Sequence, residues 1–495
     1  MSVSEDLDPL TEPTINSTPV PQEFIIPVEY TEKQLMNIKV SKAVGPDQIP
    51  NWILHDLAGI IAGPVCAIHN SSIREGYTPE IWRSADICPL PKVKPIANIR
   101  KDLRPISLTP ILAKLLEHHP VRHMRETCPN VDPSQYGAVK GSSTTHALLR
   151  ILQPIYKAVD NSSNFARLLL IDFSKAFDHI HHQTVIDKLE SNGIHPVVTK
   201  WYHGFLYSRK QRVKIGHSYS SWQTVNGGVP QGTLSGPELF IHMVSDLKTA
   251  IPDVKYMDDT TLIEIDKKKN GSKMHIAVDE ISEWSQKNQL GINGTKTKEM
   301  LISFGNPPHA PALELGDITI ERVTETKLLG VMISSNLKWD ANTHYINSKA
   351  GRRLHYLRCL KRAGLTQEEL LRTYLSLVRS VCEYACQVWS TCLTKELSNI
   401  LESIQERALR IILPNMDYDK ACEELGLPVL KARREELCAN FFKLMMKESH
   451  RLHDMIPDER LKPHDLRAQH ALPQPKWKTK RYKNSFLPWC LFNCQ

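Results

Sequence analysis

The chain lacks any stretch that could cross a membrane as an apolar helix. Its 495 residues include no uninterrupted apolar run close to the ~20 residues that such a crossing needs. The opening segment, MSVSEDLDPLTEP, is acidic and polar, unlike a secretory signal. We therefore expect an intracellular protein that does not use a membrane.

Metal-binding cysteine patterns are also missing. The 11 cysteines are an odd number and include no CxxC pair. Cys382, Cys386 and Cys392 fall in a helical-looking stretch, where packing in a core is expected. Cys490 and Cys494 have no histidine at ligand spacing. The sequence therefore predicts free thiols in a reducing compartment.

Basic residues outnumber acidic residues only slightly. We also find no internal repeats. The chain has 62 basic and 54 acidic residues, a net charge of +8. This balance permits a polyanionic partner without requiring one. The length predicts about two to four domains.

Strand and helix signals alternate through the middle of the chain. Segment 85–90 is bounded by prolines and predicts a strand, and the apolar run 167–171 predicts a strand buried on both faces. Asp178 is a good N-cap for a helix to about Glu190, with Asn192-Gly193 as its end. Beyond about residue 340, helical spacing replaces the strand signals.

The most informative pattern is Val254-Lys255-Tyr256-Met257-Asp258-Asp259-Thr260-Thr261-Leu262-Ile263. Apolar and β-prone residues flank a polar centre, which predicts a hairpin. Adjacent strand residues point to opposite faces, so two neighbouring aspartates can serve one site only in or beside a turn. We expect a tight turn at residues 257–259.

A third carboxylate follows the buried strand directly. Asp172 comes after Ile171, and a buried acid is costly unless it meets a cation or a donor. If the two strands are neighbours, Asp172, Asp258 and Asp259 form one cluster. Like charges repel, and Mg²⁺ ions, which prefer oxygen ligands, relieve that repulsion. Taken singly, each motif has a simpler interpretation: a solvated Asp-Asp turn and a helix N-cap.

Several ordered segments together resemble reverse transcriptases. Tyr256-Met257-Asp258-Asp259 is similar to their YxDD box, Ile171-Asp172-Phe173-Ser174-Lys175-Ala176-Phe177-Asp178 to motif A, and Gly228-Val229-Pro230-Gln231-Gly232-Thr233 to motif B. Segment 103–108 resembles the fingers motif of the family, and segment 135–144 resembles the next block. DFSKAFD, GVPQGTLSGP, NGTKTKEM (293–300) and 327–331 look like jockey- or CR1-type non-LTR retrotransposon enzymes. The resemblance covers about residues 35–450.

This resemblance implies an α+β fold, a right-hand polymerase of fingers, palm and thumb. The palm of the family is a ferredoxin-like antiparallel sheet backed by helices. We expect a disordered tail or linker at 1–28, fingers at 29–150 and palm at 151–335, the reverse transcriptase domain covering about 85–335. A helical thumb and C-terminal region at 336–450 and a basic tail at 451–495 would follow.

The family's metal site carries over to the matching positions. Asp172 and Asp258 would bind two Mg²⁺ ions directly, with Mn²⁺ as the alternative ion, and Asp259 would support the same site. Phe173 occupies the position whose backbone also offers a metal ligand. Two such ions activate an attacking 3′-hydroxyl and stabilise the leaving pyrophosphate.

The family's nucleotide-binding positions carry over as well. Phe177 falls at the steric gate that excludes a 2′-hydroxyl, although it could simply pack in the core. Gln231 and Gly232 lie where motif B meets the incoming nucleotide or template base. Lys92 and Arg104 match the positions of the basic side chains that hold the triphosphate. The planar fork of arginine and the point charge of lysine are both suited to phosphate oxygens.

Other features of the motifs leave alternatives open. Lys296 or Lys298 near motif D could protonate pyrophosphate as a general acid, but either could be a solvated lysine. The S-x-x-E pattern Ser235–Glu238 predicts a capping box after motif B. Basic residues at 352–362 and 476–481 are candidates for nucleic-acid phosphate contacts.

The expected activity is RNA-templated DNA synthesis within non-LTR retrotransposition. Its partners would be an RNA template, a DNA primer, dNTPs and the element's own RNA, in a ribonucleoprotein of nucleus and cytoplasm. Segment 137–142 lacks the aromatic and arginines that relatives carry, so an inactive copy that only binds RNA is the alternative. A maturase of the group II intron type is a third, without specific support. We find no endonuclease sequence upstream of residue 30 and expect the polymerase part of a longer protein, or a truncated copy.

Overall fold

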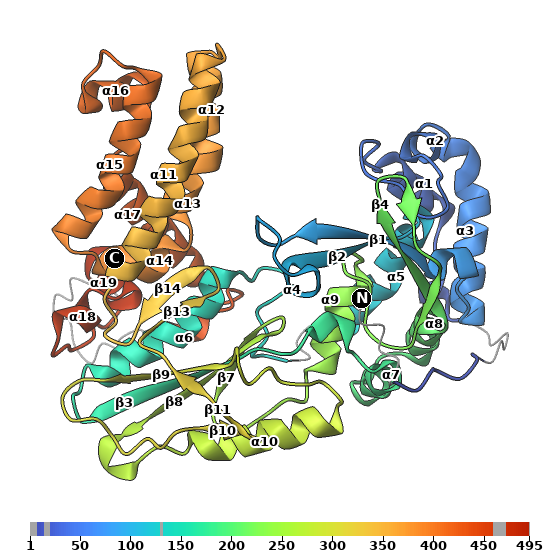
Figure 1. The fold of residues 1–495 in the computed structure, drawn as a ribbon, viewed down its shortest axis with the longest axis horizontal. Coiled ribbons are helices and arrows are strands. Elements are labelled where there is room, and N and C mark those ends of the chain that lie inside the picture. Colours follow the sequence, from blue (N-terminus) through green and yellow to red (C-terminus); the bar gives the residue numbers. More distant parts are fainter. Residues whose placement is uncertain (1–6, 14–19, 129–131, 459–471, 495) are drawn as a thin grey trace, which may run out of the picture. The chain divides into compact units, whose positions relative to one another are not determined.

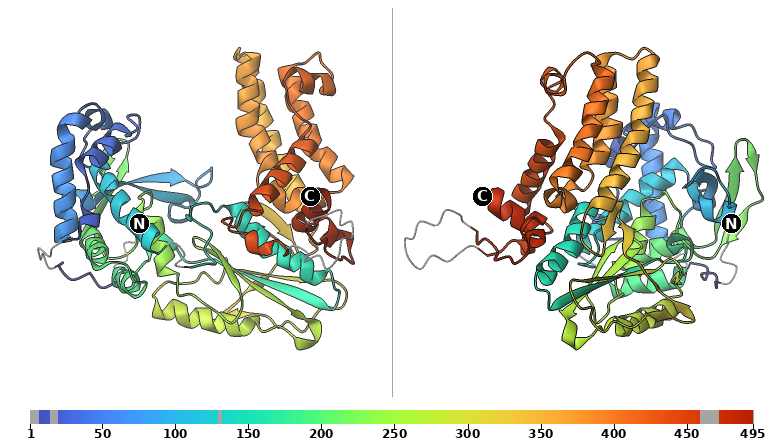
Figure 2. Two further views of the ribbon diagram at one scale, coloured as in Figure 1. Left: turned by 180° about the vertical axis from the view of Figure 1, so that it is seen from behind. Right: turned by 60° about the vertical axis from the view of Figure 1, so that its left-hand side comes forward.

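The computed structural model describes residues 7–13, 20–128, 132–458 and 472–494. The chain, drawn in Figures 1 and 2, divides into two compact units. Unit 1 comprises residues 1–138, 173–248 and 280–293, and unit 2 comprises residues 139–172, 249–279 and 294–495. The chain thus passes between the units five times, once directly between Asp172 and Phe173.

Unit 1 combines one mixed sheet with helices. Its elements are η1 (Gln22–Phe24), α1 (Val28–Met36), α2 (Asn51–Asp56), α3 (Ala58–Glu75), η2 (Glu80–Arg83), β1 (Ser84–Pro91), α4 (Ile99–Asp102), β2 (Leu103–Leu108), α5 (Ile111–Thr127), η3 (Ala176–Asp178), α7 (His182–Ser191), α8 (Pro196–Leu206), β4 (Arg209–Ile215), β5 (Ser218–Tyr219), β6 (Gln223–Val225) and α9 (Ser235–Met243). The strand order is β2-β1-β4-β5, with β6 also paired to β4. The strand predicted at 85–90 is confirmed as β1.

The start of unit 1 corrects the disordered tail predicted for residues 1–28. Residues 1–6 and 14–19 lie outside the described residues, but Gln22–Phe24 form a 3₁₀ turn. Phe24 and Ile26 are buried, and the Asn70 side chain accepts a hydrogen bond from Ile26 N at 2.8 Å. The Pro- and Ser-rich composition suggested a linker. The burial of Phe24 and Ile26 and the hydrogen bond to Asn70 of α3 instead hold this segment in a folded conformation.

Unit 2 contains a five-stranded sheet and a long helical part. Its elements are α6 (Thr144–Val159), β3 (Asn164–Ile171), β7 (Asp253–Tyr256), β8 (Asp259–Lys267), η4 (Lys268–Asn270), β9 (Lys298–Ser303), β10 (Glu314–Leu315), β11 (Ile318–Thr319), β12 (Glu321–Arg322), β13 (Glu325–Leu328), β14 (Val331–Ser334), α11 (Asp340–Arg362), α12 (Gln367–Thr373), η5 (Tyr374–Arg379), α13 (Ser380–Glu383), α14 (Cys386–Trp389), η6 (Ser390–Cys392), α15 (Lys395–Ile412), α16 (Tyr418–Glu424), α17 (Leu430–Met445), η7 (His453–Met455), α18 (Lys480–Lys483) and α19 (Phe486–Asn493). Helix α10 (Met274–Lys287) begins in unit 2 and ends in unit 1.

The sheet of unit 2 has the order β12-β9-β3-β8-β7 and is antiparallel except between β12 and β9. Its central strand β3 is almost entirely buried, as predicted from the apolar run, and α6 packs along the sheet (Figure 1). Arg167 is fully buried within β3 and pairs with Glu299 of β9 at 2.9 Å. Its guanidinium also donates to Ser272 Oγ and Pro311 O, so the buried charge is fully engaged.

The end of unit 2 corrects the basic tail predicted for residues 451–495. Residues 459–471 lie outside the described residues, but α18 and α19 are folded against the rest of the unit. Asp160, at the end of α6, accepts hydrogen bonds from Lys478 N and Thr479 N at 2.8 and 2.7 Å. Tyr482 and Phe486 are buried. The apolar residues among the lysines therefore serve packing, which the basic composition concealed.

The helix predicted from Asp178 to Glu190 is correct at its end and wrong at its start. Helix α7 begins at His182, and the ring of His181 accepts a hydrogen bond from Thr184 N at 3.3 Å. Asp178 is engaged elsewhere, because its carboxylate accepts from Gln231 Nε2 at 2.9 Å. The helix ends at Ser191, followed by Gly193 with φ of 74°.

Two further expectations concern the whole chain. Within the described ranges, no helix is both long enough and apolar enough to span a membrane. The domain boundaries at residues 150, 335 and 450 stay predictions, since the compact units are discontinuous and follow other divisions.

Candidate active site

Asp172 lies beside the predicted hairpin because of strand register. Strand β3 pairs with β8 so that Ile171 faces Thr260, and Asp172 is therefore next to the start of β8. The expectation that the two strands are neighbours is confirmed. The backbone N–H of Asp172 donates to Thr297 Oγ1 at 3.3 Å, which fixes the chain where it leaves the sheet.

The hairpin turn is as tight as the sequence predicted. Tyr256 of β7 pairs with Asp259 of β8, which leaves Met257 and Asp258 as the two turn residues. Met257 has φ of 58°, a left-handed conformation that is uncommon for a residue with a side chain. Such backbone strain persists only where the surrounding structure enforces it, and functional sites are frequent examples.

The charges of two carboxylates in the cluster act on the third, Asp259. Burial, followed by the charges of Asp258 and Asp172, raises the pKa of Asp259 to about 6. Asp172 Oδ2 is buried and accepts no hydrogen bond from any described residue. Its nearest cation is Lys296, whose Nζ lies 3.5 Å away on a largely exposed side chain. The corner therefore places three carboxylates close together, with the ammonium of Lys296 beside Asp172.

The donor chemistry of this corner fits a divalent cation. Carboxylate oxygens are the ligands that Mg²⁺ prefers, and a cation would favour the ionised form of Asp259. Across the part of the chain that the structure describes, no three or more His, Cys, Asp or Glu side chains are already gathered as a metal-binding group. The carboxylates would therefore have to draw closer together around an ion.

The structure separates the two lysines between which the sequence did not choose. Lys296 faces Asp172, as described above. Lys298 is the first residue of β9, and its ammonium pairs with Glu321 of β12. Only Lys296 is therefore associated with the carboxylate cluster, whereas Lys298 joins two strands of the sheet.

Unit 1 holds the motif B loop against the end of motif A. Besides the bond between Gln231 and Asp178, Gln231 O accepts a hydrogen bond from Ser107 N of β2 at 2.9 Å. Val229 N donates to Phe177 O at 2.8 Å. Gly228 has φ of 79°, and a Cβ there would lie 2.7 Å from Asp178 O. The loop thus needs glycine for a close backbone approach.

The two phenylalanines of motif A differ in exposure. Phe177 is half-buried and stacks on Phe240 of α9, with ring centroids 4.8 Å apart. Phe173 is buried and packs edge-on against Trp284, with centroids 6.2 Å apart. Phe177 is therefore partly exposed as a residue, while its stack on Phe240 fixes the orientation of its ring.

The capping box predicted at Ser235–Glu238 is wrong. Helix α9 begins at Ser235 with Leu234 as its N-cap, and Glu238 pairs with Arg125 at 2.8 Å. The first N–H groups, of Leu234 and Ser235, donate instead to the buried carboxylate of Glu117 at 3.0 and 2.9 Å. Glu117 is in α5, so this cap had no local signal in the sequence beyond an acid on an apolar helix face.

Lys92 and Arg104 lie at the tip of the β1–β2 hairpin in unit 1. Leu90 faces Arg104 and Pro91 faces Leu103, while Lys92 N donates to Asp102 O at 2.7 Å. Both side chains are exposed. Unit 1 thus holds Lys92, Arg104, Phe173, Phe177, Gln231 and Gly232, and unit 2 holds Asp172, Asp258, Asp259, Lys296 and Lys298.

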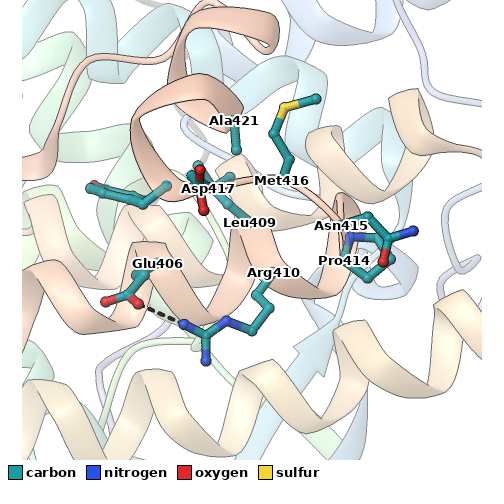
Figure 3. A pocket seen from close by; sticks show the side chains of 9 residues that line it. Glu406, Leu409, Arg410, Pro414, Asn415, Met416, Asp417 and Ala421 are labelled. Carbon is teal, nitrogen blue, oxygen red and sulfur yellow. Dashed lines mark hydrogen bonds and ion pairs between the residues drawn. The ribbon is translucent and has the colours of Figure 1, made fainter.

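A separate cavity in unit 2 contains none of these residues. It has a volume of about 310 Å³ and lies where α15 leads into α16 (Figure 3). Glu406 and Arg410 form an ion pair of 2.7 Å on one wall, and Asn415, Asp417 and Tyr418 line the rest with apolar neighbours. The cavity thus shares no residue with the carboxylate cluster.

Comparison with known proteins identifies the family of the central segment. Residues 90–333 match the family described as "Reverse transcriptase (RNA-dependent DNA polymerase)". The "Probable RNA-directed DNA polymerase from transposon BS" of Drosophila melanogaster is 25% identical over 435 residues, 82% of this chain and 46% of that protein. The corresponding protein from transposon X-element of the same species is 25% identical over 458 residues, 88% and 48% of the two chains.

A third relative is the "RNA-directed DNA polymerase from mobile element jockey" of Drosophila melanogaster, 24% identical over 408 residues, 78% of this chain and 44% of the relative. The chain spans less than half the length of these curated relatives. The matched segment includes every site residue named above, from Lys92 to Lys298. Residues 90–333 therefore form a reverse transcriptase domain, and the chain is similar to the polymerases of jockey-like non-LTR retrotransposons.

Proposed function

We propose that the chain copies RNA into DNA by adding dNTPs to the 3′-hydroxyl of a DNA primer, with release of pyrophosphate, during non-LTR retrotransposition. The observation that carries this proposal is the register that brings Asp172 beside the Met257–Asp258 turn within the matched segment. An acid at the end of a buried strand and two acids at a strained turn are costly features. A bound cation would interact favourably with all three acids and so offset the cost of placing them there.

The carboxylates of unit 2 would hold the metal ions. Asp172 and Asp258 are the proposed direct ligands, Asp259 the supporting one and the Phe173 backbone a further donor. Two Mg²⁺ ions, or Mn²⁺, would supply Lewis acidity for the attacking hydroxyl and neutralise the charge on the leaving pyrophosphate. Lys296, beside Asp172, would deliver a proton to pyrophosphate as a general acid.

The residues of unit 1 would hold the nucleotide. Lys92 and Arg104 would contact the triphosphate, and the backbone of Gly232 and the side chain of Gln231 would meet the nucleotide or template base. Phe177, held by its stack on Phe240, would present a fixed ring to the sugar and so disfavour a 2′-hydroxyl. This assignment corresponds to a right-hand polymerase with fingers, a ferredoxin-like palm and a thumb. The element's own RNA is the proposed template, in a ribonucleoprotein of nucleus and cytoplasm.

The test is extension of an oligo(dT) primer on poly(rA) by the purified chain with Mg²⁺ and dNTPs. Asp258→Asn keeps the size of the side chain and removes its charge, and we expect it to lower the rate at least ~10³-fold, or about 4 kcal/mol. Asp266→Asn, at the far end of β8, is the matched control and should extend normally. Binding of the template–primer without extension by the unaltered chain would support the alternative, an inactive copy that only binds RNA.

A further inference from the structure

Unit 1 also contains a partly exposed basic and aromatic segment, formed by the strands β4, β5 and β6. We call residues 209–225 the basic arm. Its sequence contains four cations, Arg209, Lys210, Arg212 and Lys214, and no acidic residue. It also carries Tyr219 and Trp222, and residues 215–224 are exposed throughout. The arm is drawn in green in Figure 2 (right).

Strand geometry places three of the four cations of the basic arm on one face, whereas Arg209 is buried. Residues of a strand alternate between faces, so Lys210, Arg212 and Lys214 of β4 project to the same side. Tyr219 of β5 lies directly opposite Lys214 and shares that side. On the other edge of β4, Asp86 of β1 faces Arg212.

The two aromatic rings are held in place by Arg212. Its guanidinium carbon lies 4.0 Å from the ring centre of Tyr219 and 4.4 Å from that of Trp222. Arg212 is itself fixed by an ion pair of 2.7 Å with Asp86, which is 1% exposed. Tyr219 and Trp222 nevertheless remain 42% and 39% exposed. The rings are thus ordered before any ligand arrives, and part of each is open to solvent.

The charge of this face is only partly neutralised. Asp86 compensates Arg212, and Lys210 pairs with Glu80 through two solvated side chains, which makes that pair weak. Lys214 lies 5.6 Å from the Tyr219 ring centre and forms no ion pair with a carboxylate of the described residues. If Tyr219 and Trp222 served packing alone, their rings would be expected to be buried. They are instead partly exposed, and Lys210 and Lys214 lie on the same face.

From this geometry we infer that the basic arm binds single-stranded nucleic acid, with bases stacked on Tyr219 and Trp222 and phosphates held by Lys214 and Lys210. Ordered aromatic rings among cations suit single strands, since every base offers a π-face and stacking does not depend on sequence. Preordered side chains also lose little conformational freedom on binding. The inference rests on the proposed function only in naming an RNA template as one source of the strand, and single-stranded DNA shares its chemistry.

The experiment measures fluorescence anisotropy of labelled 12-nucleotide RNA and DNA strands, and of a blunt duplex, with the full chain. Trp222→Ala should weaken binding of both single strands about tenfold, because one stacking contact contributes that order of affinity. Trp222→Phe should restore most of it. Trp52→Ala, which removes another exposed tryptophan of unit 1, should leave the affinity unchanged.

Salt dependence tests the charged half of the inference. Lys214→Ala should reduce the slope of log K against log salt by about 0.7, the value for one phosphate contact on a single strand. Lys33→Ala, an equal charge change on α1, should not alter the slope. Melting temperatures of all variants should agree within a few degrees, which separates lost binding from lost folding.

The outcomes distinguish this inference from the proposed function. Single-strand affinities of Trp222→Ala and Lys214→Ala that match those of their controls would overturn the role of the arm, even if the chain extends primers. The inference would also be overturned if these variants weakened binding of the duplex but not of the single strands. If the unaltered chain fails to extend any primer but the arm variants weaken single-strand binding, the polymerase proposal fails and the arm inference stands.

Discussion

The two sets of candidate site residues are built in different ways. In unit 2, Asp172 and Asp259 are fixed by the register of β3 against β8, inside a sheet that contains a buried ion pair. In unit 1, Phe177 and Gln231 depend on loop contacts: a hydrogen bond to Asp178, another to Ser107 and a glycine at Gly228. Strands thus position Asp172 and Asp259, whereas loop contacts position Phe177 and Gln231.

This difference predicts how each region responds to change. A side chain on a paired strand can be replaced with little movement of its neighbours, so a substitution there should affect chemistry more than stability. A loop held by single hydrogen bonds and one tight glycine has fewer restraints, so a substitution there should move several site residues together. The predictions below test that contrast, from the largest expected effect to the smallest.

The largest effect should separate the two lysines of unit 2. Lys296→Ala should slow single-turnover nucleotide addition about 100-fold, the ordinary contribution of a general acid. Lys298→Ala should slow it no more than about threefold, because Lys298 pairs with Glu321 and not with the carboxylate cluster. The rates should be followed across pH, and an equal loss in both variants would remove Lys296 from the proposed role.

The next effect concerns the loop of unit 1. Gly228→Ala places a Cβ against the Asp178 carbonyl at a positive φ and should lower the free energy of unfolding by about 2–3 kcal/mol. Gly216→Ala is the control, since Gly216 also has positive φ but no atom near its Cβ position, and it should cost about 1 kcal/mol. Urea unfolding midpoints measure both, and equal midpoints would mean that the loop is less constrained than its contacts indicate.

A smaller effect is expected on the discrimination between the deoxyribose and ribose of the incoming nucleotide. Phe177→Val removes the ring that Phe240 orients, and the preference for dNTP over rNTP should fall about 10- to 100-fold. The ratio of kcat/KM for the two nucleotides measures it. Phe177→Tyr retains the ring and should retain the preference, whereas an unchanged ratio in Phe177→Val would leave Phe177 with a packing role only.

The smallest effect is a pH dependence of stability in unit 2. The pKa of Asp259 is raised to about 6 in the folded protein, so folding favours the protonated acid. In the absence of metal, stability should fall as pH rises from about 4 to about 6. Because Asp259 keeps solvent exposure, the change should be below about 1 kcal/mol. Asp259→Asn should lack it in thermal melts, and a rise in stability over this range would contradict the direction.

Some of this protein could be read from local sequence. The buried strand β3, the Met257–Asp258 turn and the strand β1 follow from apolar periodicity and turn chemistry, which act within a few residues. The adjacency of Asp172 and the hairpin was expected only on the condition that their strands are neighbours, which the pairing of β3 with β8 confirms. The family motifs then supplied the expected roles.

Other features needed contacts between distant residues. The start of α7 and the cap of α9 were mispredicted because Gln231 engages Asp178 and Glu117 reaches Leu234 and Ser235 across more than 100 positions. The folded segments near the two ends of the chain could not be predicted from composition. Composition reports how many lysines and prolines a segment has, but not which distant residues contact Phe24 or Thr479.

The sequence by itself determined which residues are acidic, which strands are buried and where the tight turn lies, because these depend on short-range chemistry. Only the tertiary structure decided that Lys296, not Lys298, faces Asp172, and that Arg212 holds two exposed rings. Both depend on which strand lies beside which. That pairing is fixed by burial and hydrogen bonding across the whole sheet rather than by neighbours along the chain.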